Sequence, residues 1–212
     1  MKRLGYLLFA VLAITLMLGG NAFADGGGDN SVYFVTYYSN ANTTGAPDAT
    51  LRIINDGDYT GCIVTGDVEC IDPSEPLYAA IYVFDDSQEM RSCCACEITA
   101  DGLLSESVNK QLTANEFTGR GQMTRGVIKV VSSSSYDPTN PVPFPGLRGW
   151  ATHIEATTNI PEKSPWRVTE TTLADSNLSS TELYNLGALC SYGLTLGSGY
   201  GLCPCTNEDY DF

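Results

Sequence analysis

The stretch LYAAIYVFDDSQEMRSCCACEI (Leu77–Ile98) decides the fold of this 212-residue chain. Its first part, Leu77–Phe84, is the most continuous apolar run beyond the N-terminal region. The length and aromatic content of this run favour a buried central strand over a helix. Cys93, Cys94 and Cys96 follow closely. Because successive side chains of a strand point to opposite faces, Cys94 and Cys96 are expected on one face and Cys93 on the other.

The chain has eight cysteines, an even number that is typical of a disulfide framework in an oxidising compartment. Counting alone leaves roughly a hundred pairings open, but the alternation of faces narrows them. We expect two bridges from one face of the first cysteine cluster to the C-terminus, and one bridge from its other face to a C-terminal helix. The expected bridges join Cys94 and Cys96 to Cys203 and Cys205, and Cys93 to Cys190.

The remaining two cysteines, Cys62 and Cys70, flank a Gly66-Asp67 turn, so the two ends of a small hairpin are expected to form a local bridge. A metal site is the alternative use of the cysteine clusters, because thiolates bind zinc and iron–sulfur clusters. The clusters lack the Cys-x-x-Cys spacing usual for such sites. The pattern therefore favours disulfides, and no cofactor or metal is expected.

Five further segments rich in β-branched and aromatic residues are predicted to be strands. In one of them, alternation places Trp150, Thr152 and Ile154 toward the core. The serine- and proline-rich segment Ser132–Gly146 is predicted to be a loop, and Asp101–Thr118 matches neither strand nor helix clearly. The five predicted strands are Ser31–Tyr38, Thr50–Ile54, Gly126–Val131, Trp150–Glu155 and Trp166–Thr172.

One helix is predicted near the C-terminus. Ser179–Glu182 matches a capping box, in which a serine hydroxyl and a glutamate carboxylate each accept a hydrogen bond from a free backbone N–H. Pro204 has no N–H for a sheet ladder, so its segment is predicted to be an edge strand. The predicted fold is mainly β, a disulfide-stapled antiparallel β-sandwich-like domain with one C-terminal helix. The apolar stripe of that helix consists of Leu183, Leu186, Cys190 and Leu194.

The first 24 residues are expected to be a cleaved secretory signal of the bacterial type. Lys2 and Arg3 supply the positive start, an uncharged apolar run follows, and the small residues Ala22 and Ala24 precede the expected cleavage point. No later apolar run is long enough to span a membrane. The sequence therefore indicates secretion to the extracellular space or the cell surface.

Residues 25–212 are expected to form a single extracellular β-rich domain, in which residues 25–38 combine a flexible glycine-rich leader with the first strand. The formal net charge of the chain is −14. A protein this acidic is repelled by nucleic acids and by anionic lipids, which excludes a nucleic-acid-binding function. The acidic residues are scattered along the chain, as expected for a solvated surface.

Catalytic motifs are missing from the sequence. His153 is the only histidine, and alternation places it on the exposed face of its strand. No Gly-x-Ser-x-Gly motif accompanies it. We therefore expect no enzymatic activity. A hydrolase that uses carboxylates stays open as an alternative, because paired acids cannot be selected among so many by sequence alone.

Several segments resemble a group of secreted, cysteine-rich bacterial proteins that share a CCxC … C … CxC framework and have no assigned function. The resemblance implies secretion and a common cysteine framework, and it assigns no role to any residue. The segments that carry it are Ile81–Met90, Cys93–Cys96, Leu103–Asn109, Leu112–Asn115, Gly126–Lys129 and the closing Cys203–Cys205.

The leading functional hypothesis is a structural or assembly protein, the subunit of an extracellular filament or surface polymer held together by strand addition. Its partners are further copies of itself or other surface components. The first strand is apolar on both faces and follows a flexible leader, so it is the candidate assembly strand; pairing within its own sheet is the alternative. A secreted module that binds glycan or a small ligand through Trp150, Trp166 and surface tyrosines is the second hypothesis. The assembly residues are Val32, Tyr33, Phe34, Val35, Tyr37 and Tyr38.

Overall fold

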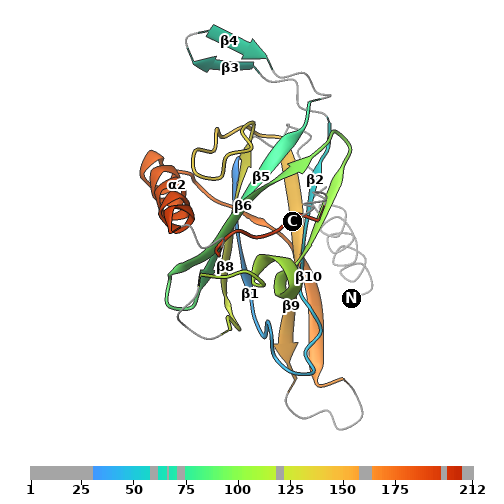
Figure 1. Cartoon of the computed structure of the whole chain (residues 1–212). Helices are drawn as coiled ribbons and strands as arrows, with labels where there is room; N and C mark the ends of the chain where they lie inside the picture. Colours follow the sequence, from blue (N-terminus) through green and yellow to red (C-terminus); the bar gives the residue numbers. More distant parts are fainter. Residues whose placement is uncertain are drawn as a thin grey trace, which may run out of the picture.

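Two antiparallel sheets pack face to face in a computed structural model of the chain (Figure 1). The structure describes residues 31–57, 62–65, 67–70, 75–117, 122–157, 164–196 and 200–206, and for 62–65 and 67–70 it describes the backbone alone. The expected signal and leader, residues 1–30, lie outside this range. The elements are β1 (Tyr33–Tyr38), β2 (Thr50–Asn55), β3 (Cys62–Thr65), β4 (Asp67–Cys70), β5 (Leu77–Asp85), β6 (Met90–Ile98), β7 (Leu103–Ser107), the π-helical turn η1 (Val108–Leu112), β8 (Gly126–Ser133), β9 (Leu147–Ala156), β10 (Trp166–Thr172), β11 (Ala174–Asp175) and α2 (Ser180–Thr195).

The five-stranded sheet has the order β11-β1-β8-β5-β6, and the four-stranded sheet has the order β10-β9-β2-β7. All neighbouring strands in both sheets run antiparallel. The chain crosses between the sheets repeatedly, and β5–β6 and β9–β10 are the pairs of consecutive strands that stay together. The separate hairpin β3–β4 lies beyond the end of the two sheets (Figure 1). The predicted fold class, a disulfide-stapled β-sandwich with one C-terminal helix, is confirmed.

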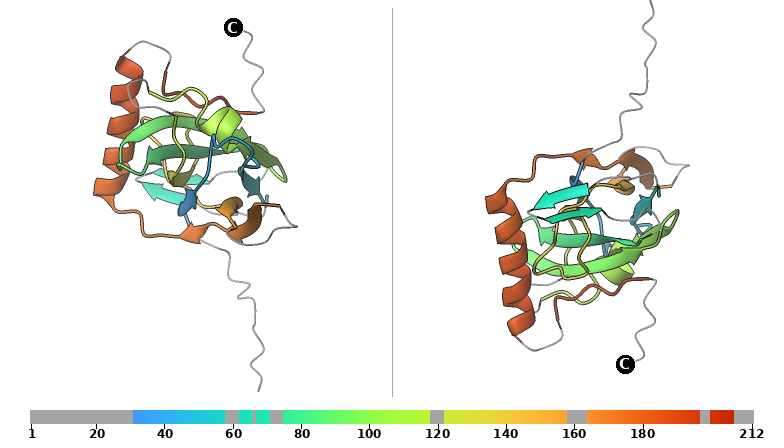
Figure 2. Two further views of the ribbon diagram at one scale, coloured as in Figure 1. Left: turned by 90° about the horizontal axis from the view of Figure 1, so that it is seen from below. Right: turned by 90° about the horizontal axis from the view of Figure 1, so that it is seen from above.

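Strand β5 is buried on both faces, which explains its unbroken apolar sequence. Ile81 and Val83 belong to the core between the two sheets, whereas Tyr82 and Phe84 belong to a second core under α2. Figure 2 shows α2 along the outer side of the five-stranded sheet. The sheet therefore has apolar contacts on both sides, as fully buried strands require.

The C-terminal segment runs along the free edge of β6 and then reaches the other sheet. Cys93 N donates to Gly201 O at 2.8 Å, and Cys203 N donates to Cys93 O at 3.2 Å. Thr206 N donates to the Glu106 carboxylate of β7 at 2.7 Å. The prediction of an edge strand around Pro204 is wrong, because the ladder is limited to an isolated bridge between Cys93 and Leu202.

The predicted faces of β9 are wrong in part. Ala151 and His153 are buried, whereas Trp150 and Thr152 are only half-buried. Small residues occupy the inward positions because neighbouring side chains approach closely; a Cβ at Gly149 would lie 2.6 Å from Leu173 Cδ1. Burial of Ile154, the third predicted residue, is confirmed.

The segment Asp101–Thr118, ambiguous in sequence, contains β7 and the π-helical turn η1. The start of η1 is capped by Ser107, whose hydroxyl accepts a hydrogen bond from Lys110 N at 2.8 Å. Strand β8 continues through Ser132 and Ser133, so the predicted loop begins two residues later than expected, at Ser134.

Candidate functional site around the first strand

The first strand lies inside the five-stranded sheet. It forms six residue pairs with β8, from Tyr33 opposite Val131 to Tyr38 opposite Gly126, and two pairs with β11. On one flank β1 therefore has a full-length neighbour and on the other only a short one. Of the candidate assembly residues, Tyr33, Phe34 and Tyr38 are buried, Val32 and Val35 are half-buried, and Tyr37 is exposed.

The inner face of β1 enters the core between the sheets. Phe34 and Tyr38 are 3% and 1% exposed. The Tyr38 hydroxyl donates to Phe84 O at 3.0 Å, and burial together with the nearby carboxylates of Asp85 and Glu116 raises its pKa. Gly126 makes room for this contact, because a Cβ there would lie 2.7 Å from the Tyr38 hydroxyl oxygen and 1.9 Å from Phe84 O.

The outer face of β1 is fixed to the helix. The Tyr33 hydroxyl donates to Glu182 Oε1 at 2.9 Å, and Lys129 Nζ of β8 donates to the same oxygen at 2.6 Å. The hydrogen bond from Lys129 lowers the pKa of Glu182 against the effect of burial, and the hydrogen bond from Tyr33 contributes in the same direction. One carboxylate thus joins β1, β8 and α2, beside a cavity of about 280 Å³ that Phe84, Lys129 and Glu182 help to line.

His153 contacts the exposed end of β1. Its ring stacks on Tyr37 with 4.1 Å between centroids, and its nitrogens lie 3.1 Å from Tyr37 O and 2.7 Å from Thr171 Oγ1. The prediction that His153 is exposed is wrong, since its exposed fraction is 2%. A carbonyl of β1 and a threonine hydroxyl of β10 lie within hydrogen-bond distance of the two nitrogens, so the imidazole of β9 links three strands.

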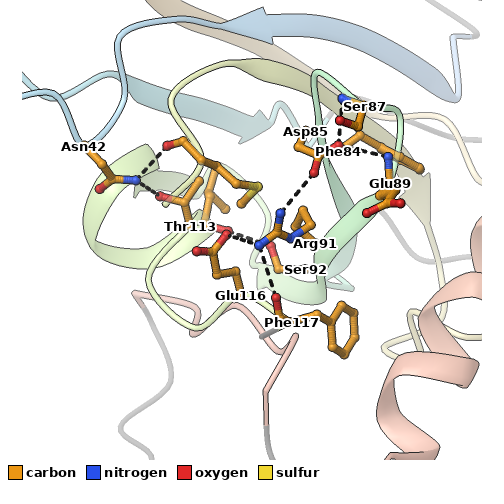
Figure 3. Close-up of polar contacts among 12 residues, drawn as sticks. Asn42, Phe84, Asp85, Ser87, Glu89, Arg91, Ser92, Thr113, Glu116 and Phe117 are labelled. Atoms are coloured by element: carbon orange, nitrogen blue, oxygen red, sulfur yellow. Dashed lines mark hydrogen bonds and ion pairs between the residues drawn. The ribbon is translucent and has the colours of Figure 1, made fainter. Parts of the chain in front are cut away.

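A buried ion cluster is formed by Arg91, Asp85 and Glu116 (Figure 3). The charges of all three act on the Tyr38 hydroxyl, so the cluster lies close to that end of β1. Arg91 Nη1 contacts Asp85 Oδ2 at 3.0 Å, and Arg91 Nη2 contacts Glu116 Oε2 at 2.9 Å and donates to Phe117 O at 3.2 Å. Arg91 lies at a register shift between β5 and β6, where Met90 is opposite Phe84 and Ser92 is opposite Val83. Such an extra residue bends its strand and redirects its side chain.

The two carboxyls of this cluster have opposite pKa shifts. Burial acts to raise the pKa of Asp85, but hydrogen bonds from Glu89 N, from Arg91 and from Ser87 N lower it below its usual value. Burial raises the pKa of Glu116 despite the charge of Arg91. Arg91 lies between the two carboxylates and forms an ion pair with each. Arg91, Asp85 and Glu116 thus act as a structural clamp that joins the β5–β6 turn to the loop at Glu116.

Sequence reasoning missed this cluster. The acidic residues after β5 were visible, but Glu116 is distant in sequence and belongs to a segment without a clear pattern. The signal available in the sequence was a single arginine two residues before the cysteine cluster, in a strand that is otherwise uncharged up to Glu97. An arginine in a buried strand requires a carboxylate partner, which the adjacent turn could supply.

Three disulfides join β6 to the C-terminal part of the chain: Cys93–Cys190, Cys94–Cys203 and Cys96–Cys205. The predicted pairing of these six cysteines is confirmed. Their sulfurs are not available as thiolate ligands, although those of Cys94, Cys96 and Cys205 lie close together. The expected bridge between Cys62 and Cys70 involves side chains outside the described set; the backbone places these two residues opposite each other in the β3–β4 hairpin.

The two tryptophans do not form one binding platform. Trp150 is opposite Thr172 and Trp166 is opposite Ala156, at the two ends of the β9–β10 ladder. At about 3.3 Å per residue this separates them by roughly 20 Å. Trp150 lines a cavity of about 300 Å³ together with Phe34, Arg148 and Asp175, whereas Trp166 packs against the core.

Among the residues that the structure describes, no helix has the length and apolarity needed to cross a membrane. Comparisons with protein-family models, with curated proteins and with solved structures find no match for this chain.

Proposed function

We propose that this protein is exported and is a structural subunit that assembles outside the cell by exchange of its first strand between copies. The observation that carries the proposal is the placement of β1. Its inner face and Tyr33 of its outer face are buried, it is the first strand of the described chain, and the sequence before Cys62 contains no cysteine. Strand β1 can therefore leave its own sheet without breaking a covalent bond.

Exchange conserves the contacts that hold β1. A strand from a second copy would meet the same β8 ladder, the same core position of Phe34 and Tyr38, and the same carboxylate of Glu182. Exchange of identical elements between copies is a low-cost route to association for this reason. Main-chain hydrogen bonds provide affinity in strand addition, and the side-chain positions provide register.

The connection after β1 is long enough to bridge two copies. Residues 39–49 link β1 to β2 and span about 35 Å when extended. When β1 pairs within its own sheet, residues 39–49 fold back, and Asn40 and Asn42 have φ values of 55° and 53°. Their anchors are hydrogen bonds, from Ser39 and Asn40 to Ile154 O and from the Asn42 amide to Thr113 and Met123. These bonds are the ones that an exchanged strand would break.

The three disulfides hold together the part of the subunit from which β1 would be exchanged. The three disulfides fix α2 and the C-terminal segment to β6, at the opposite edge of the five-stranded sheet from β11 and β1. The body of the subunit therefore keeps its shape while β1 is absent. Disulfides of this kind fit an oxidising compartment, which agrees with the secretory signal expected at the N-terminus.

A competition experiment tests the proposal. The chain beginning at Asp25 is expected to form polymers visible by electron microscopy, and a synthetic peptide of residues 25–38 in excess is expected to shorten them by occupying the β1 slot. A scrambled peptide is the control. Because the intact chain is used, the result does not depend on whether a chain without β1 folds. A monomer that stays monodisperse at high concentration, or polymers that the peptide leaves unchanged, would contradict strand exchange.

A further inference from the structure

The outer face of α2 carries an exposed apolar stripe. Tyr184, Tyr192 and Leu196 are 74%, 67% and 57% exposed, and Leu189 is 45% exposed. Tyr184, Ala188, Tyr192 and Leu196 follow one another at intervals of four, which places them on one side of a helix. The opposite side, with Leu186 and Cys190, packs against the sheet. The helix therefore has two apolar sides, and the described part of the chain covers only one of them.

A groove runs beside this stripe. It has a volume of about 460 Å³ and lies between α2 and the loop at Thr139, with Pro141, Leu183, Tyr184 and Ala188 in its lining. The backbones approach closely at its base, because a Cβ at Gly187 would lie 2.3 Å from Thr139 O. No charged side chain lines the groove.

The lack of charge on this face contrasts with the rest of the chain, whose formal net charge is −14. The helix sequence STELYNLGALCSYGLT contains one charged residue, Glu182, which is paired with Lys129 at 2.6 Å. Asp137 in the adjacent loop accepts hydrogen bonds from Thr139 N and Oγ1 at 2.8 and 2.7 Å. Two copies of a strongly acidic protein repel each other, and the scarcity of charge on this face lowers that repulsion.

We infer that a second copy of this chain docks on α2. The exposed tyrosines and the groove lie on the same face, so two copies related by a two-fold axis can each place Tyr184 and Tyr192 against the groove of the other. Such isologous contacts are the commonest in homo-oligomers. Each buried aromatic side chain covers about 150–250 Å², and a standard interface covers about 800 Å² per partner. The two tyrosines of each copy therefore supply about half of a standard interface, so the contact forms a weak dimer.

The test compares two double variants by sedimentation equilibrium. Tyr184→Glu with Tyr192→Glu adds two charges to the docking face, and Leu103→Glu with Val168→Glu adds the same charge at residues of the four-stranded sheet that are 55% and 53% exposed. All four positions are exposed, so the fold is retained. The measurement is made with the peptide of residues 25–38 in excess, which blocks strand exchange. Under that condition we expect wild type and the sheet variant to dimerise at concentrations up to about 1 mM, and the helix variant to have a dissociation constant at least about tenfold higher. Equal association of both variants, or a wild type that stays monomeric, overturns the inference.

The outcome can be separated from that of strand exchange, because the docking face contains no residue of β1. If both contacts exist, electron microscopy shows polymers of the helix variant that no longer associate side by side. If strand exchange fails and this inference holds, wild type forms dimers and nothing longer. Polymers of the helix variant that associate laterally as wild type does count against the α2 interface.

Discussion

At the scale of single residues, His153 gives β1 a sensitivity to acid. Burial lowers its pKa, because the imidazolium loses its hydration, and this effect outweighs the hydrogen bond to Tyr37 O that favours the charged form. The folded-state pKa therefore lies below the value of about 6.5 for an unfolded chain. The stability that this group provides is complete above about pH 6.5 and is lost as the pH falls toward the folded-state pKa.

Replacement of His153 by Gln tests this dependence. We expect His153→Gln to lower the melting temperature at neutral pH, because the contacts with Tyr37 and Thr171 weaken, but to reduce the further loss between about pH 7 and pH 5. Carboxylates titrate in both proteins, so the difference between the two pH profiles isolates the histidine. Thermal melts in matched buffers provide the measurement, and parallel profiles would show that His153 does not titrate there.

The two arginines that pair with the β5–β6 turn provide a second test. Arg91 is 5% exposed and pairs with Asp85, whereas Arg125 is 70% exposed and pairs with the next residue, Asp86. Removing one partner of a buried ion pair typically costs about 3–5 kcal/mol, and an exposed pair contributes about 0–1 kcal/mol. We therefore expect Arg91→Met to lower the free energy of unfolding by about 3 kcal/mol or more, and Arg125→Met by less than about 1 kcal/mol. Urea denaturation with intact disulfides measures both, and similar losses would contradict the clamp.

At the scale of elements, the local sequence predicts the start of helix α2 but not the contacts that attach the helix to the sheet. The Ser179 hydroxyl accepts from Glu182 N at 3.0 Å, as the capping box requires. The Glu182 carboxylate instead binds Tyr33 and Lys129, so the reciprocal half of the box gives way to contacts with β1 and β8. The start of the helix was thus predictable, but its attachment was not, because the partners are far apart in sequence.

The strands also have some features that the local sequence predicts and others that depend on distant residues. The long run of β5 and the alternation of Cys93, Cys94 and Cys96 depend on neighbours in sequence, and both were predicted. The order of the sheet, which places β1 between β8 and β11, depends on pairings between residues about ninety or more apart in sequence. The prediction of which β9 residues face the core is wrong in part. An apolar pattern favours large residues such as Trp150 in the core, and it cannot reveal that Gly149 and Ala151 occupy these positions instead.

At the scale of the whole molecule, the three disulfides close overlapping loops. All of them begin within Cys93–Cys96, and the residues they join are 97, 109 and 109 apart in sequence. A first bridge that closes a loop of about 100 residues contributes close to 5 kcal/mol in the chain-entropy description. Once it exists, a neighbouring bridge restricts a much shorter loop, and its own contribution falls to about 2–3 kcal/mol.

This overlap predicts that the two bridges to the C-terminal segment partly replace each other. Removing Cys94–Cys203 or Cys96–Cys205 alone, by alanine at both cysteines, leaves the other bridge to hold nearly the same loop and is expected to cost about 2 kcal/mol of chain entropy. Removing both frees the segment beyond Cys190 and is expected to cost about 5 kcal/mol, which exceeds the two single losses together by about 1 kcal/mol. The packing lost with each sulfur pair largely cancels in the double-mutant cycle, so the coupling energy reports the loop. Free energies of unfolding without reductant provide the cycle. Additive losses would contradict this coupling and would mean that each bridge stabilises its end of β6 independently.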